Sequence, residues 1–188
     1  MKIGIIGGGV WGSALAKLLS VNKVYIIARD KKVVNSINEH RFNPKLKYAV
    51  FNENVSATDD LNELRNMDYI FLALPSQNIR LVLSKIDLTK INQEIIIASK
   101  GIEINSLSFL NEVVYKITRN KNINILSGPC FSEEVSQNLP TAVTFASNNK
   151  ETFNKVSLLF QKKNFRIYYS DDLIGCQIGG ALKNIYGC

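Results

Sequence analysis

Three glycines near the N-terminus have a spacing that suits phosphate binding. Gly7, Gly9 and Gly12 form a G-x-G-x-x-G pattern between an apolar run, residues 3–6, and a helix-favouring segment, residues 13–19. The first glycine permits a tight turn, the second lets a pyrophosphate approach the backbone, and the third allows close helix–sheet packing. Free N–H groups at the helix start then face the anion. The pattern predicts a dinucleotide site, and the alternative is a glycine turn without a ligand.

Two lysines are further candidates for ligand contact. Lys100 follows directly on a predicted strand, residues 94–99, and a lysine at that end of a strand is well placed to meet a ligand. Lys183 follows small residues at 179–181, which indicate a tightly packed terminal helix. The spacing alone leaves open whether Lys183 enters a site or lies on the surface.

The residues after the second predicted strand, residues 23–28, would select the cofactor. An acidic residue there holds the ribose 2′-OH of NAD, whereas an arginine accommodates the 2′-phosphate of NADP. Arg29 and Asp30 offer both chemistries. Arg29 comes first and favours NADP without excluding NAD, and an ordinary surface Arg–Asp pair is the alternative.

Hydrophobic periodicity predicts the elements that position these residues. Further strands are expected at 69–74, 123–127, 141–146 and 165–169, and helices at 77–85, 107–119 and 150–162. The helix at 107–119 carries an apolar stripe that begins at Leu107 and is expected to face the core. Residues 31–54 are expected to form a helix and then an irregular polar stretch, with His40 on the surface.

The candidate ligand residues share one position relative to the strands. The glycine loop, Pro75-Ser76, Lys100-Gly101 and Gly128-Pro129 each follow a predicted strand. In a doubly wound parallel sheet these strand ends lie along one edge, where ligands bind. We therefore expect an α/β fold of the Rossmann type, a mostly parallel sheet with helices on both faces, and a single crevice.

Composition narrows the classes of function. The 188 residues are 46% apolar and 21% charged, and no apolar run has the length of a membrane span. Three cysteines without C-x-x-C spacing argue against a disulfide framework or a metal site and favour a cytoplasmic location. The net charge of +7 is scattered, which argues against nucleic acid and favours a small phosphorylated substrate. No internal domain boundary is visible.

Four sequence blocks together resemble the bacterial-type NAD(P)-dependent glycerol-3-phosphate dehydrogenases. They are Gly7-Gly8-Gly9-Val10-Trp11-Gly12-Ser13-Ala14-Leu15-Ala16, Ala98-Ser99-Lys100-Gly101, Gly128-Pro129-Cys130-Phe131 and Gly180-Ala181-Leu182-Lys183-Asn184. They occur in the family's order and approximate spacing, and the resemblance covers the whole chain.

The resemblance implies reversible hydride transfer between NAD(P)H and dihydroxyacetone phosphate, giving sn-glycerol 3-phosphate for phospholipid synthesis. It implies that Lys183 is the catalytic proton donor and acceptor, which requires a lysine pKa lowered by burial or by a neighbouring positive charge. It further implies site residues as follows: Lys100, Gly128 and Cys130 at the substrate, and Gly7, Gly9, Val10, Trp11, Gly12, Arg29, Lys100 and Ser132 at the cofactor. A homodimer of the full-length protein is compatible with the family.

Two departures from the family pattern stand out. Cys130 replaces a serine whose hydroxyl would bind substrate, and a thiol is a weaker donor. The family also continues into a helical substrate domain, so residues 1–188 are expected to be the cofactor-binding domain alone and inactive by themselves. Alternatives are a non-catalytic NAD(P)-binding module and a dehydrogenase of the 6-phosphogluconate or 3-hydroxyacid type.

Overall fold

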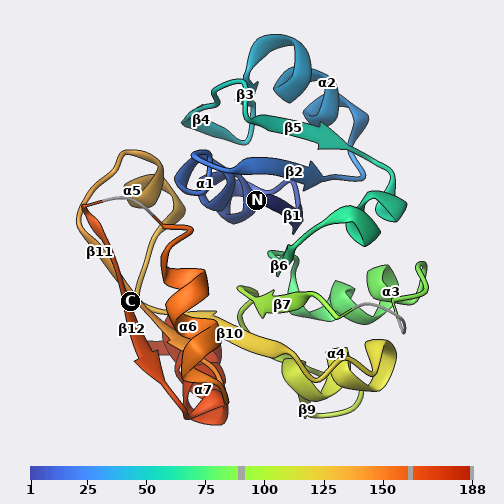
Figure 1. Ribbon diagram of the computed structural model, residues 1–188, viewed down its shortest axis with the longest axis vertical. Helices are drawn as coiled ribbons and strands as arrows, with labels where there is room; N and C mark the ends of the chain where they lie inside the picture. The colour runs from blue at the N-terminus through green and yellow to red at the C-terminus, as the bar shows by residue number, and fades with distance from the viewer. Residues whose placement is uncertain (89–91, 161–162, 187–188) are drawn as a thin grey trace.

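The computed structural model describes residues 1–88, 92–160 and 163–186. At its centre is an eight-stranded sheet with the strand order β12-β11-β10-β7-β6-β1-β2-β5 (Figure 1). The strands are β1 (Lys2–Ile6), β2 (Lys23–Ile27), β5 (Val55–Thr58), β6 (Tyr69–Leu72), β7 (Glu94–Ile97), β10 (Ile123–Ser127), β11 (Thr141–Ala146) and β12 (Phe165–Ser170). Neighbouring strands are parallel except for the antiparallel pair β10 and β11.

Helices and two small ribbons connect these strands. The helices are α1 (Val10–Leu18), α2 (Lys31–His40), α3 (Ile79–Leu83), α4 (Leu110–Thr118), α5 (Ser132–Ser136), α6 (Lys150–Ser157) and α7 (Leu173–Tyr186), with 3₁₀ turns η1 (Leu61–Asn66) and η2 (Ser76–Asn78). The ribbons are β3 (Phe42–Asn43) with β4 (Leu46–Val50), and β8 (Ile102–Glu103) with β9 (Ser108–Phe109).

Apolar side chains are buried on both faces of the sheet. Along β7, Ile96 joins the core cluster that contains residues of α1, α2 and α6, whereas Ile95 and Ile97 join the cluster that contains residues of α3 and α4. This alternation follows from the period of two in a strand, and strands buried on both faces are typical of parallel sheets. The predicted doubly wound α/β fold is therefore confirmed.

The segment after α2 differs from the prediction. The stretch expected to be irregular forms the antiparallel hairpin β3–β4, in which Phe42 pairs with Val50 and Asn43 with Leu46. The strand β5 then adds to the edge of the sheet beside β2, and the sequence analysis missed it. Strand β5 is as long as β6 and β7, but polar Ser56 and Thr58 interrupt its apolar residues, whereas β6 and β7 are nearly continuous apolar runs. Strand β3 has only two residues.

Leu107 is not part of the core. It is 82% exposed with φ of 50°, and α4 begins three residues later, at Leu110. The ribbon β8–β9 occupies the chain before α4, so the predicted stripe starts too early. Its next members, Leu110, Val113 and Val114, are buried as predicted.

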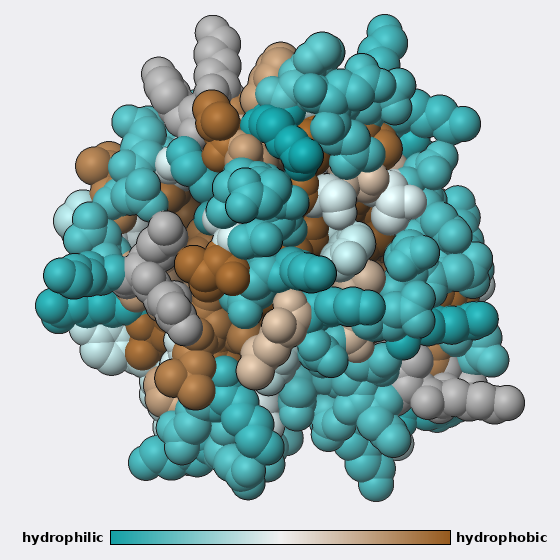
Figure 2. All heavy atoms as spheres, turned by 45° about the horizontal axis from the view of Figure 1, so that its top comes forward, coloured by the Kyte–Doolittle hydropathy of each residue, from teal (hydrophilic) through white to brown (hydrophobic). Residues whose placement is uncertain are grey.

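The surface is mainly hydrophilic. Hydrophilic side chains cover most of the face seen in Figure 2, and apolar side chains show through in separate patches. His40 lies on the surface with 65% of its side chain exposed, as predicted. None of the helices in the described ranges combines the length and apolar character needed to cross a membrane. The side chains of Asn184 and Ile185, and the whole of Cys188, lie outside the described residues.

Candidate active site

The glycine loop joins β1 to α1 and leaves room for a ligand. Gly7 has φ of +131°, a conformation that residues with a side chain rarely adopt. A Cβ on Gly12 would collide with the carbonyl oxygen of Gly7, so only glycine lets α1 begin this close to the strand. A Cβ on Gly9, in contrast, would meet no atom within 4 Å. The space beside Gly9 is therefore open.

The first turn of α1 offers donors beside that space. Gly9 is the N-cap, no side chain caps the helix, and the turn holds no acidic residue. The first intrahelical bond from this cap is donated by the Ser13 N–H to the Gly9 carbonyl at 3.0 Å, so the preceding amides have no partner within the helix. Open space, free amides and the positive end of the helix dipole fit a pyrophosphate.

Trp11 links the first turn of α1 to the carboxyl end of β7. Its indole Nε1–H donates to the carbonyl oxygen of Ala98, just after β7, at 3.0 Å. A contact of Trp11 with the cofactor would therefore use its ring or its backbone, because the indole N–H is already bonded. Val10, the other predicted contact in this turn, is 46% exposed.

The four strand ends that the sequence singled out do lie side by side. The strands β10, β7, β6 and β1 are consecutive and parallel in the sheet, so their carboxyl ends share one edge (Figure 1). The loops that follow them are in contact. Ser99 Oγ after β7 donates to the Leu72 carbonyl of β6 at 3.0 Å, and a Cβ on Gly101 would lie 2.7 Å from Ser76 Oγ.

The two candidate lysines bind the same short segment of backbone. Lys100 Nζ donates to the Gly128 carbonyl at 2.9 Å, and Lys183 Nζ donates to the Cys130 carbonyl at 3.3 Å. The helix α7 approaches β10 closely because Gly180 lacks a side chain; a Cβ there would lie 2.8 Å from Ser127 Oγ. Residues 28 and 53 positions apart in the sequence are thus brought together.

Burial shifts the pKa of two groups in this cluster, Lys100 and Cys130. Burial lowers the pKa of Lys100, and the nearby positive charge of Lys183 lowers it further, against an opposing effect of Cys130. Burial raises the pKa of the Cys130 thiol despite both lysines, so the thiol is protonated at neutral pH. Lys183 Nζ also lies 3.9 Å from the ring centre of Phe131, a cation–π distance.

A groove of about 950 Å³ opens beside this cluster. Its walls come from the end of β10, from β11 and β12, and from α7, and include Ser127, Gly128, Pro129, Phe131, Tyr168, Gly179, Leu182 and Lys183. Ile174 and Ile178 on α7 are 50% and 41% exposed. The lysine cluster therefore lies at the side of an open and partly apolar groove.

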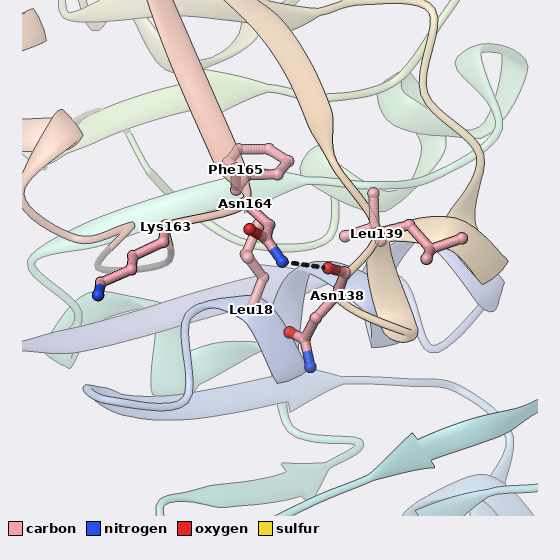
Figure 3. Close-up of a pocket in the computed structure, with 7 residues that line it drawn as sticks. Leu18, Asn138, Leu139, Lys163, Asn164 and Phe165 are labelled. Carbon is pink, nitrogen blue, oxygen red and sulfur yellow. Dashed lines mark hydrogen bonds between the residues drawn. The ribbon is translucent and has the colours of Figure 1, made fainter.

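A second, smaller cavity lies between the end of α1, the helix α5 and the start of β12. It has a volume of about 260 Å³ and is lined by Leu18, Val135, Asn138, Leu139, Lys163, Asn164 and Phe165 (Figure 3). Asn164 Nδ2 donates a hydrogen bond to the Asn138 backbone carbonyl at 2.8 Å, so this donor and this acceptor are paired with each other. No residue of the predicted site lines it.

Arg29 lies apart from the lysine cluster, whereas Ser132 directly follows Phe131 of that cluster. Arg29 is exposed just after β2, which is separated from β10 by β1, β6 and β7. Ser132 is partly buried at the start of α5, a helix that packs against α1. The predicted cofactor contacts thus extend over both sides of the glycine loop.

Sequence reasoning missed residues that hold the site together. Asn43 is fully buried, and its Nδ2 donates to the Gly8 carbonyl at 3.1 Å and to Ser13 Oγ at 2.6 Å. Arg80 and the buried Glu103 form a two-pronged ion pair, at 2.7 and 2.8 Å, beside the loop that carries Lys100. Asparagine in a polar stretch, and opposite charges 23 positions apart, give no local signal of such contacts.

Most of the chain matches a known protein family. Residues 2–153 match the model of the family described as NAD-dependent glycerol-3-phosphate dehydrogenase N-terminus. The chain is 44% identical to a glycerol-3-phosphate dehydrogenase (NAD(P)+) of Clostridium botulinum, over 98% of this chain and 57% of that protein. The counterpart in Novosphingobium aromaticivorans is 38% identical over 98% of this chain and 56% of that protein.

A solved structure gives the same result. The crystal structure of glycerol-3-phosphate dehydrogenase from Coxiella burnetii superposes with a TM-score of 0.87 at 31% identity, covering 98% of this chain and 58% of that one. The chain spans about half the length of the curated relatives it matches. It belongs to the family of NAD-dependent glycerol-3-phosphate dehydrogenases and matches their N-terminal part.

Proposed function

We propose that this chain is the cofactor-binding part of an enzyme that reduces dihydroxyacetone phosphate to sn-glycerol 3-phosphate with NAD(P)H. The observation that carries the proposal is the placement of the open glycine loop and of both lysines along one edge of the sheet. A dinucleotide on the loop would extend along this edge, because ligands of open α/β sheets bind outside the carboxyl ends of the strands.

NAD(P)H, when bound, supplies the hydride. The chain's own residues bind and orient the reactants: the glycine loop holds the pyrophosphate, and Lys100 holds the substrate oxygens near the nicotinamide. Lys183 gives a proton to the oxygen of the ketone as that oxygen becomes a hydroxyl. The carbonyls of Gly128 and Cys130 accept hydrogen bonds from the two ammonium groups and so position them for these contacts.

The two cations also suit the phosphorylated substrate class. They attract an anion, and their partial burial strengthens this attraction relative to that of exposed lysines. A cytoplasmic location is part of the same proposal; it is supported by Cys130 and Cys176, which are both free thiols.

Direct binding and turnover of residues 1–188 test the proposal. We expect the 188 residues to bind NADPH in a calorimetric titration and to oxidise it very slowly with saturating dihydroxyacetone phosphate. The reason is that positioning of reactants contributes about 7–11 kcal/mol to catalysis, and the relatives hold their substrates with nearly twice the chain length.

Two outcomes would contradict it. Failure to bind either NADPH or NADH would remove the cofactor role. Turnover near the typical enzyme rate of about 10 per second would show that these residues already form a complete site.

A further inference from the structure

Asp30 occupies the position at which acidic residues read the ribose 2′-hydroxyl, but its carboxylate is already engaged. It is the N-cap of α2, where Oδ1 accepts from the Lys32 N–H at 3.1 Å. Its other oxygen, Oδ2, lies 3.2 Å from Lys45 Nζ. The hydrogen bond from Lys45 lowers the pKa of Asp30, so the carboxylate is charged and paired at neutral pH.

Lys45 is held there by the hairpin β3–β4. Asn43, the last residue of β3 before the turn, is fully buried and donates to the Gly8 carbonyl of the glycine loop. The Oδ1 atom of the same asparagine accepts from the Lys45 N–H at 2.9 Å. The backbone of Lys45 is therefore fixed relative to the loop that would hold the pyrophosphate, and its side chain reaches Asp30 from a different element.

The charges around this point favour an anion. Asp30 follows Arg29 in the chain and is compensated by Lys45. Asp59, which follows the neighbouring strand β5, lies with its Oδ2 3.9 Å from Lys31 Nζ, so it also has a cation beside it. Arg29 is exposed and lies directly after β2. A phosphate on the ribose would meet the Arg29 guanidinium without the full repulsion of an unpaired carboxylate next to it.

We propose that Lys45 is a specificity-determining residue that selects the 2′-phosphorylated dinucleotide by neutralising Asp30 and denying it to the ribose 2′-hydroxyl. This inference rests on dinucleotide binding at the glycine loop. It extends the cofactor-selecting element from the end of β2 to the β3–β4 hairpin.

Titrations of NADPH and NADH, followed by calorimetry, test this role without any need for turnover. Lys45→Gln frees the carboxylate from its ion pair, and we expect the ratio of NADPH to NADH affinity to fall by about twofold to fivefold, the range of an exposed charge pair. The double variant Asp30→Asn, Lys45→Gln removes the unpaired charge, and asparagine still caps α2. It should recover most of the parent's preference.

A matched control is Lys155→Gln. Lys155 pairs with Glu151 at 2.9 Å on α6, which packs against β12 at the other edge of the sheet. This variant should leave the ratio unchanged. An unchanged ratio in Lys45→Gln, or a double variant no better than the single one, would overturn the inference while NADPH binding by the parent upholds the proposed function. Binding of neither dinucleotide by the parent would overturn both.

Discussion

The nucleotide side and the lysine side of this site are built by different means. On the nucleotide side, one short segment supplies Gly7, Gly9 and Gly12, and its function depends on backbone groups and on the absence of side chains. On the lysine side, Lys100 and Lys183 reach one backbone segment from two distant elements. The first side is formed within one short segment, and the second depends on how α7 packs against β10.

This difference indicates which part of the site is supported by its own neighbouring elements and which part is open. The glycine loop is closed by β1, α1 and the buried Asn43. The lysine side borders an open groove, and α7 exposes Ile174 and Ile178. We therefore expect changes at the loop to affect nucleotide binding more than folding stability, and changes under α7 to affect folding stability more than nucleotide binding.

Gly9→Val should have the largest effect on binding. The new side chain enters open space in the folded protein but occupies the place of the pyrophosphate. NADPH affinity should fall about a hundredfold or more, at least about 2.7 kcal/mol, with a loss of folding stability near 1 kcal/mol. Calorimetric titration and thermal unfolding measure the two effects.

Gly179→Val is the matched control, because a Cβ on Gly179 also meets nothing within 4 Å. It should leave NADPH affinity unchanged. Normal NADPH binding by Gly9→Val would show that the pyrophosphate does not lie on this loop.

Arg29→Ala tests which residue on the nucleotide side contacts the 2′-phosphate. Loss of a charge-assisted contact should weaken NADPH by about 1–3 kcal/mol and NADH by much less. Fluorescence titration of both dinucleotides measures the difference, with the exposed Arg166 of β12 changed to alanine as the control. Equal losses for both cofactors would mean that Arg29 does not read the 2′-phosphate.

Gly180→Ala disturbs the packing of α7 against β10 on the lysine side. The added methyl group would lie 2.8 Å from Ser127 Oγ, so the Ser127 side chain must rotate or α7 must shift, and we expect a loss of about 1–2 kcal/mol in folding stability with NADPH affinity retained. Adding Ser127→Ala removes the clash and should restore much of the stability in denaturant unfolding. A single variant as stable as the parent would show that α7 does not depend on this close approach.

Arg80→Gln should have the smallest effect, because it touches only the loop that carries Lys100. Arg80 and then Ser106 lower the pKa of Glu103, so this pair stabilises the fold above the ordinary glutamate pKa of about 4.3. The stabilisation is lost as pH falls through the lower pKa of the folded state. We expect about 1 kcal/mol, since Arg80 is 43% exposed.

Unfolding by denaturant across the acid range measures this contribution. The parent should lose more stability than Arg80→Gln between neutral pH and acid pH, and the exposed pair of Lys155 and Glu151 provides the comparison through Lys155→Gln. Parallel curves for the parent and Arg80→Gln would contradict the role of the pair.

Local sequence patterns were enough to predict most strands of the sheet and the position of the glycine loop. The long apolar strands, the glycine spacing and the ligand residues after four strands all follow from chemistry within a few neighbouring residues. The period of two and the restricted geometry of parallel sheets then place those strand ends on one edge. The roles of the individual site residues remain predictions.

Only the tertiary structure decided the rest. The hairpin β3–β4 and the strand β5 lack the continuous apolar run that reveals β6 and β7. Leu107 lies outside the core because the ribbon β8–β9 occupies the chain before α4. The contacts of Asn43, the pairing of Lys45 with Asp30 and the meeting of Lys100 with Lys183 at one backbone segment depend on partners far away in the sequence. Buried Asn43 needs a partner for its polar atoms, whereas Lys45 and Asp30 are half exposed and attract each other by charge. In each case the packing of distant elements selects which partner is within reach.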